Sequence, residues 1–201
     1  MKKWNMALAS IASAALCLGT VAQAQTSFPI EPRPFHFEYT YAEISYVDMD
    51  DGLNGLAANA SYRLQDNLNI LAGMISTASD KNDYDVLRLS LAYNAAWPDA
   101  GYNVDYMSYA GLESRRRQHQ RSNGARVSEQ DISLRVGTRL QLALQPRLIV
   151  YTDLAFTLLD SGKLALNNGL IYHLTGRLSL QASYELSDQH QFNLGIRVTQ
   201  R

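Results

Sequence analysis

Apolar and polar residues alternate along most of this 201-residue chain. Such alternation puts apolar side chains on one face of a β-strand and polar side chains on the other. From Phe35 onward the pattern divides the chain into segments of about 10–14 residues, which is long enough for a tilted strand to cross a bilayer. We expect ten strands, at 35–48, 53–64, 68–78, 84–94, 102–113, 128–143, 147–159, 163–173, 177–187 and 191–200.

Three of the turns between these segments have a Leu-x-x-x-Leu pattern, at 64–68, 144–148 and 174–178. Very short turns between alternating segments are typical of transmembrane β-barrels. We therefore predict an all-β fold, a closed antiparallel up-and-down transmembrane β-barrel of ten strands. Merging a weakly patterned segment with its neighbour would give eight strands with longer loops, and the pattern leaves that alternative open.

The two faces of the predicted strands differ in chemistry. One face is apolar and is expected to contact lipid, as in the second strand, which carries Leu56, Ala58, Ala60, Tyr62 and Leu64. The opposite faces carry charged residues, which we predict to form a lumen charge network: Glu43, Arg63, Arg88, Asp105, Arg135, Arg139, Asp153, Glu185 and Arg197. Unpaired charges are costly in the dry core of a soluble sandwich. This face therefore indicates the polar lumen of a narrow barrel, largely filled by side chains.

The longest predicted connection, from Ser114 to Arg126, is strongly basic. If both termini are periplasmic, the Leu-x-x-x-Leu turns are periplasmic and this connection faces outward. Arginine guanidinium groups match the geometry of phosphate, so we interpret the connection as a candidate surface loop for lipopolysaccharide phosphates. A solvated loop with no dedicated ligand is the alternative. The arginines concerned are Arg115, Arg116, Arg117, Arg121 and Arg126.

The amino terminus has the pattern of a secretory signal. Lys2 and Lys3 precede an apolar run, which ends in a small-x-small site at Ala24. We predict a cleaved signal peptide at 1–24, an extended lead at 25–34, and the barrel domain at 35–201. The apolar run is shorter than the ~20 residues that a membrane-spanning helix needs. The signal predicts export across the inner membrane and residence in the cell outer membrane.

Composition excludes several functions. The chain has 18 basic and 19 acidic residues, and loss of Lys2 and Lys3 with the signal leaves a net charge of −3, so we expect no nucleic-acid partner. The only cysteine, Cys17, lies within the predicted signal, which excludes a thiolate site in the mature chain. The acidic stretches at 48–52 and 79–83 fit tight turns better than calcium loops. We expect no metal and no cofactor.

The four histidines give no catalytic constellation. His36 and His173 belong near the predicted periplasmic side, and His119 and His190 belong to outer connections. A barrel enzyme needs a nucleophile, a base and an orienting acid at one rim, and no such motif is evident. We predict a non-enzymatic protein with no catalytic residue, and keep a lipid-modifying enzyme only as an alternative.

From about Phe35 to Arg201 the chain resembles the small outer-membrane β-barrel proteins of Gram-negative bacteria, in the broad class of the outer membrane protein A transmembrane domain and porin-like barrels. The signal, the opening strand at 39–46, the repeated turns and the closing segment at 192–198 carry this resemblance. It departs from the usual pattern at the end, where Thr199, Gln200 and Arg201 stand in place of a terminal aromatic residue. The resemblance assigns no functional residue.

The resemblance implies a protein inserted by the barrel assembly machinery and surrounded by outer-membrane lipids, with lipopolysaccharide as a candidate partner. A structural or surface-binding role is the first interpretation. The alternatives are a narrow pore for ions or small solutes, an adhesin or lipopolysaccharide-binding protein, and a lipid-modifying enzyme. The sequence leaves the oligomeric state open.

Overall fold

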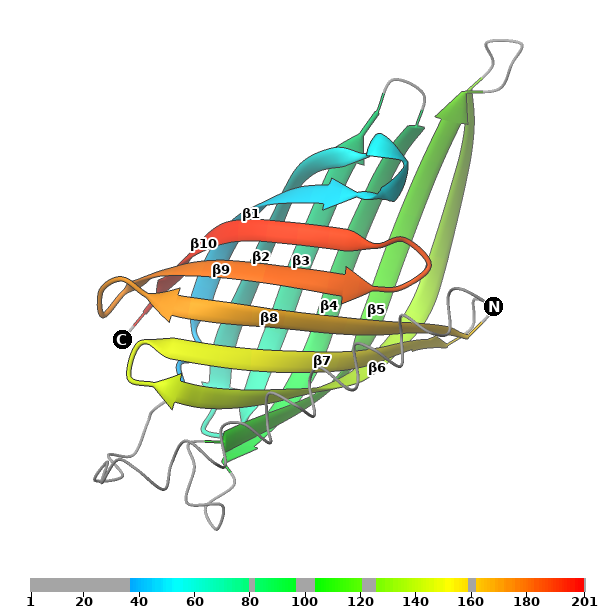
Figure 1. Cartoon of the computed structure of the whole chain (residues 1–201). Coiled ribbons are helices and arrows are strands. Elements are labelled where there is room, and N and C mark those ends of the chain that lie inside the picture. The colour runs from blue at the N-terminus through cyan, green and yellow to red at the C-terminus, as the bar shows by residue number, and fades with distance from the viewer. Residues whose placement is uncertain (1–36, 80–81, 97–103, 121–125, 159–161, 201) are drawn as a thin grey trace, which may run out of the picture. The chain divides into compact units, whose positions relative to one another are not determined.

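A computed structural model describes residues 37–79, 82–96, 104–120, 126–158 and 162–200. The predicted signal peptide and lead lie outside these residues. Ten antiparallel strands close into a barrel, in which each strand pairs with its neighbours in sequence and β1 pairs with β10 (Figure 1). The strands are β1 (Tyr41–Met49), β2 (Asn54–Gln65), β3 (Leu68–Ala78), β4 (Asn82–Ala96), β5 (Val104–Gln120), β6 (Arg126–Gln145), β7 (Leu148–Leu158), β8 (Lys163–His173), β9 (Leu178–Leu186) and β10 (Gln191–Thr199).

The ten-stranded up-and-down barrel is confirmed, and the eight-stranded alternative is wrong. A single 3₁₀ turn, Asp50–Gly52, joins β1 to β2. None of the described residues forms a helix long and apolar enough to cross a membrane.

Strands β5 and β6 are longer than the sequence pattern predicts. β5 continues to Gln120 and β6 begins at Arg126, so most of the connection predicted at 114–126 is strand and not loop. The apolar alternation stops near Leu112 because both faces become polar, while backbone pairing continues as far as His119 opposite Asn82. The two long strands rise beyond the rest of the barrel in Figure 1. The predicted basic loop is therefore a hairpin extension.

The outward face of the barrel is apolar, as predicted. Leu87 and Ile132 are 63% and 67% exposed, and every strand has at least one exposed large apolar side chain, which is Met74 on β3 and Leu112 on β5. The inward face is mainly polar and buried, with two apolar clusters. One cluster includes Val47, Ile75 and Tyr84, and the other includes Ile149, Tyr151 and Ile171. The alternation thus fixes which residues enter the lumen.

Candidate functional site

Glu113 on β5 is the centre of the densest charge cluster in the lumen. Its side chain is fully buried and accepts hydrogen bonds from three arginines. Arg88 Nε donates at 2.6 Å, Arg115 Nε at 2.5 Å and Arg135 Nη1 at 3.2 Å. These arginines come from β4, β5 and β6, which are adjacent in the barrel. We call Glu113, Arg88, Arg115 and Arg135 the arginine hub.

A second cluster is formed around Asp153 on β7. Arg139 on the neighbouring strand β6 donates from both Nε and Nη2 to Asp153 Oδ2, at 3.0 and 2.8 Å. Tyr109 on β5 donates its hydroxyl to Asp153 Oδ1 at 2.7 Å. The guanidinium of Arg139 also lies over the ring of Tyr151, 4.7 Å from its centroid. Asp153 therefore joins three strands.

A third cluster crosses the seam where the first and last strands pair. Arg197 on β10 donates from Nη2 and Nε to Glu43 Oε2 on β1, at 2.8 and 3.1 Å. Gln181 on β9 donates to Glu43 Oε1 at 3.0 Å and accepts from Arg197. Arg197 also lies 3.8 Å from the centroid of the Tyr41 ring. Both members of the ion pair are buried, so the pairing offsets much of their desolvation cost.

Two tyrosine side chains in the lumen extend over the neighbouring strand, because the residue that pairs in register with each tyrosine is a glycine. Tyr109 pairs in register with Gly137 and Tyr151 with Gly169. A Cβ at Gly137 would come within 2.5 Å of Tyr109 Cζ, and one at Gly169 within 2.4 Å of Tyr151 Cζ. Lying over these glycines, Tyr109 reaches Asp153 one strand beyond, and the Tyr151 hydroxyl accepts from Gln181 on β9.

The end of the barrel near the carboxy terminus of β10 is partly closed by the residues before β1. Tyr39 donates its hydroxyl to Asp105 on β5, and Arg63 lies over the Tyr39 ring at 5.2 Å. Phe37 packs against the apolar cluster of Ile149, Tyr151 and Ile171 on β7 and β8. We call Phe37–Tyr39 the N-terminal strap. The predicted first strand at 35–48 was too long, since β1 begins at Tyr41.

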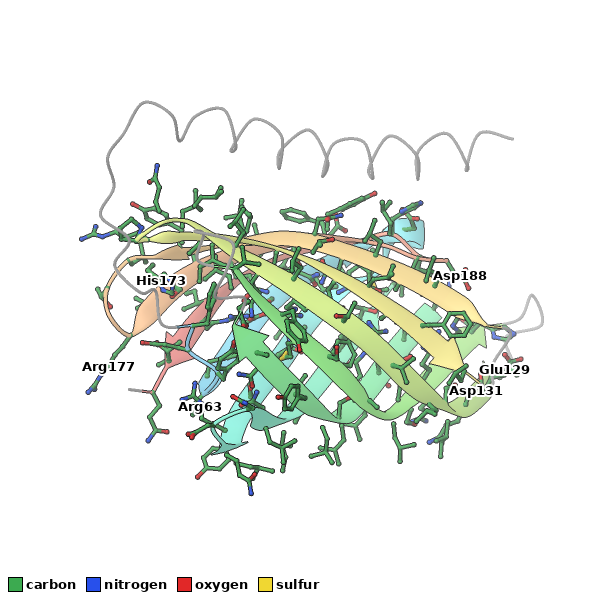
Figure 2. The ribbon with its side chains drawn as sticks, turned by 90° about the horizontal axis from the view of Figure 1, so that it is seen from below. Arg63, Glu129, Asp131, His173, Arg177 and Asp188 are labelled. Atoms are coloured by element: carbon green, nitrogen blue, oxygen red, sulfur yellow. The ribbon has the colours of Figure 1, made fainter. Side chains whose placement is uncertain are left out.

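The nine residues predicted for the lumen charge network differ in how deeply they are buried. Glu43, Asp105, Arg135, Asp153, Glu185 and Arg197 are buried, and Arg88 and Arg139 are partly buried. Arg63 is exposed at one end of the barrel. In Figure 2, Arg63, His173 and Arg177 lie at this end, whereas Glu129, Asp131 and Asp188 lie at the other, which we call the outer end.

The residues of the predicted basic loop are separated by the strand alternation. Arg115 enters the lumen as part of the arginine hub, and Arg117 lies over the Tyr84 ring at 5.4 Å. Arg116 is exposed on the opposite face, where it donates to Ser128. Arg126 is the first residue of β6, and Arg121 lies outside the described residues. Alternation along β5 therefore places Arg115 and Arg116 on opposite faces of the strand.

Several lumen residues were not singled out from the sequence. They include Glu113, Tyr109, Tyr151, Gln181 and Tyr39. Glu113 shares the face of Asp105 in the predicted strand at 102–113, so the period of two could have identified it. The cross-lumen contacts of Gln181 and Tyr39 depend on the shear of the barrel, which local patterns do not carry.

In the described part of the chain, two adjacent cavities lie within the lumen. The larger has a volume of about 130 Å³ and is lined by four arginines, Arg88, Arg135, Arg139 and Arg197, and by three acids, Glu43, Asp153 and Glu185. A smaller cavity of about 20 Å³ is lined by Arg115, Arg117, Lys163 and Asp188, among others. Both cavities share Arg88, Glu185 and Gln191. The lumen therefore holds space for a few small molecules such as water.

Among the described residues, no group of three or more histidine, cysteine or acidic side chains is arranged to hold a metal ion. The site is instead a set of ion pairs around polar space inside a closed barrel with an apolar exterior. A closed antiparallel barrel with an apolar exterior and a polar interior has the architecture of the transmembrane β-barrels.

Solved structures of similar fold are barrels of this kind. They include the KdgM porin in complex with disordered oligogalacturonate, at 9% identity and a TM-score of 0.49, covering 80% of this chain and 99% of that one. The N-terminal β-barrel domain of Pseudomonas aeruginosa OprF has 13% identity and a TM-score of 0.47, covering 81% and 98%. Ail, the attachment invasion locus protein of Yersinia pestis, has 15% identity and a TM-score of 0.39, covering 79% and 97%.

No protein-family model and no curated protein sequence matches the chain. At these identities the likeness concerns the fold alone.

Proposed function

We propose that this chain is an outer-membrane barrel with a charged lumen largely filled by its own side chains, and that its role is structural or surface-binding and not enzymatic. The proposal includes export by the signal at 1–24, insertion by the barrel assembly machinery, and contact of the apolar band with outer-membrane lipids. It also includes Arg116, on the outward face of β5, as a contact for lipopolysaccharide phosphate.

One observation carries the filled-lumen proposal: side chains from opposite walls enclose only small cavities. Arg88 on β4 and Glu185 on β9 lie on opposite sides of the strand order, yet both line the cavity of about 130 Å³ and the cavity of about 20 Å³. Arg139 on β6 and Tyr41 on β1 likewise line the larger cavity from opposite sides. Side chains that leave such small volumes between opposite walls leave no wide aqueous channel.

Conductance in planar bilayers tests this proposal. The refolded barrel is expected to give no stable single-channel steps, because the side chains that fill the bore obstruct ions. Replacing Arg88→Ala together with Glu185→Ala shortens two side chains on opposite walls of both cavities and is expected to introduce small steps.

The matched control changes the outward neighbours on the same two strands, Leu87→Ala with Tyr184→Ala, and is expected to stay silent. Large, stable steps in the unaltered protein would contradict the filled lumen.

A narrow pore is the second candidate, and the two cavities that share Arg88, Glu185 and Gln191 favour it. If the unaltered barrel conducts in small steps, the arginines lining the larger cavity are expected to set its ion selectivity. Arg135→Ala with Arg139→Ala should then shift the reversal potential measured under a salt gradient.

A further inference from the structure

The arginine hub has more hydrogen-bond donors than its carboxylate can accept. Each guanidinium carries five N–H donors, whereas one carboxylate offers about four acceptor positions. Arg88, Arg115 and Arg135 each place one nitrogen on Glu113, and Arg115 adds a bond of 3.4 Å to Thr157. By contrast, Arg139 and Arg197 each place two nitrogens on their own carboxylate. Among the described residues, the hub therefore combines more guanidinium groups with one carboxylate than either of the other two clusters does.

The charges around the hub do not balance. Its three arginines pair with Glu113, and Arg88 shares both cavities with Glu185, so the guanidinium groups outnumber these two carboxylates by one. Arg117 and Lys163 line the smaller cavity nearby, and Lys163 pairs with Asp188 at 3.5 Å.

Two acidic residues at the outer end of the barrel also pair in register with arginines of β5. Glu129 and Asp131 are the register partners of Arg117 and Arg115, but both acids are exposed at the outer end (Figure 2). Exposed charges are screened by salt, whereas a buried charge is screened much less. The positive excess at the hub therefore persists, and a buried unbalanced charge is costly without a counter-ion.

Space for a counter-ion adjoins the hub. Arg88 and Arg135 line the cavity of about 130 Å³, and Arg88 and Arg115 line the smaller one at the outer end. The Arg88 side chain remains 24% exposed and lines both cavities, so part of it is accessible from them. At about 30 Å³ for each water molecule, the larger cavity has room for roughly four, and so for a small polyatomic ion.

We propose that the arginine hub is a binding site for a small free oxyanion, a carboxylate or phosphate group, held by Arg88 and Arg135 in the larger cavity, beside Arg115. Planar guanidinium groups match such groups through paired N–H donors. The proposal rests on the filled, outer-membrane barrel proposed above, because a wide channel would leave the hub solvated. It gives the lumen a ligand-binding role.

The experiment observes the arginine Nε–Hε signals by NMR in ¹⁵N-arginine-labelled barrel in detergent micelles. Sodium phosphate, and separately sodium acetate, is titrated at constant ionic strength. The signals of Arg88, Arg115 and Arg135 are expected to shift saturably. Arg88→Gln is expected to weaken phosphate binding about tenfold, the effect of losing one charge-assisted hydrogen bond.

The matched control is Arg177→Gln, which makes the same charge change at an exposed position at the opposite end and is expected to leave binding unchanged. Shifts that grow linearly without saturation, or saturable shifts that persist equally in Arg88→Gln, would overturn the proposal.

Should Arg88→Gln fail to fold, as seen by loss of heat-dependent gel mobility, Glu185→Gln provides the second test. Removing this competing acid is expected to tighten phosphate binding several-fold, and unchanged or weaker binding would overturn the site. The titration needs no membrane conductance, so failure of the anion site is distinguishable from failure of the filled lumen.

Discussion

At the scale of single residues, small side chains determine where large ones lie. Tyr109 and Tyr151 reach past their neighbouring strands only because Gly137 and Gly169 leave room beneath their rings. Each tyrosine then binds a polar partner on the strand beyond, and Tyr151 also supports the guanidinium of Arg139. The glycines therefore act on the charge network although they carry no polar side chain.

Gly137→Ala tests this dependence. The added methyl group overlaps the Tyr109 ring, so the ring must move and its hydroxyl must leave Asp153. Such overpacking is expected to lower the free energy of unfolding by about 1–3 kcal/mol, measured by urea titration in micelles. The control is Thr138→Ala on the outward face of the same strand, where no change beyond experimental error is expected. Equal stability of the two variants would contradict the role of the glycine.

At the scale of elements, the β5–β6 hairpin stands apart from the other hairpins. β6 pairs with β7 only from Leu134 onward, so its first residues pair with β5 alone. Apart from Ile132 at its base, the outward residues of the extension are polar, among them Ser114, Arg116 and Ser128. An extension with so little apolar surface on its outer face and one paired edge contributes little to the closure of the barrel.

Replacing residues 119–127 with an Asn-Gly turn is therefore expected to leave a folded barrel. Asn-Gly is suited to the two-residue turns that join antiparallel strands. The shortened protein should keep the heat-dependent gel mobility of the full chain and lie within about 1 kcal/mol of its unfolding free energy, since surface changes rarely cost more. Failure to form the compact, heat-modifiable species would show that the extension is needed for assembly.

The bounds of the strands also show how much of the fold could be predicted from the sequence. Alternation predicts β3 and β8 with their observed bounds, because each combines one apolar and one polar face between clear turns. It underestimates β5 because a strand that is polar on both faces has no hydrophobic period. Alternation also assigns Phe37 and Tyr39 to β1, because the N-terminal strap is an extended segment whose residues alternate as in a strand. Local sequence patterns cannot predict that Arg88 and Glu185 line the same cavities, since only closure of the barrel brings β4 and β9 to opposite sides of one lumen.

At the scale of the whole molecule, the outward apolar residues form a band that ends where polar residues take over. On β4, Leu87, Leu89 and Leu91 are more than half exposed, whereas Asp85 on the same face bonds to Ser76. This change of chemistry along one strand sets how deeply the barrel sits in lipid.

Leu89→Arg is expected to destabilise the barrel in lipid vesicles by about 2–4 kcal/mol, because a lipid-facing charge near the bilayer centre is costly. Asp85→Arg on the same face, beyond the leucines, is expected to cost about 1 kcal/mol or less. Reversible unfolding with guanidinium chloride gives both values. Equal costs at the two positions would contradict the boundary of the band.

The pairing of β1 with β10 has a consequence for the order of events during folding. Tyr41–Met49 has no partner on one side until Gln191–Thr199 has been synthesised, since the seam joins the two ends of the domain. Contacts between residues so distant in sequence form slowly, and unpaired strand edges expose a growing chain to aggregation. The chain is therefore exposed to aggregation until the seam closes, and the Glu43–Arg197 ion pair can form only when β1 and β10 have paired.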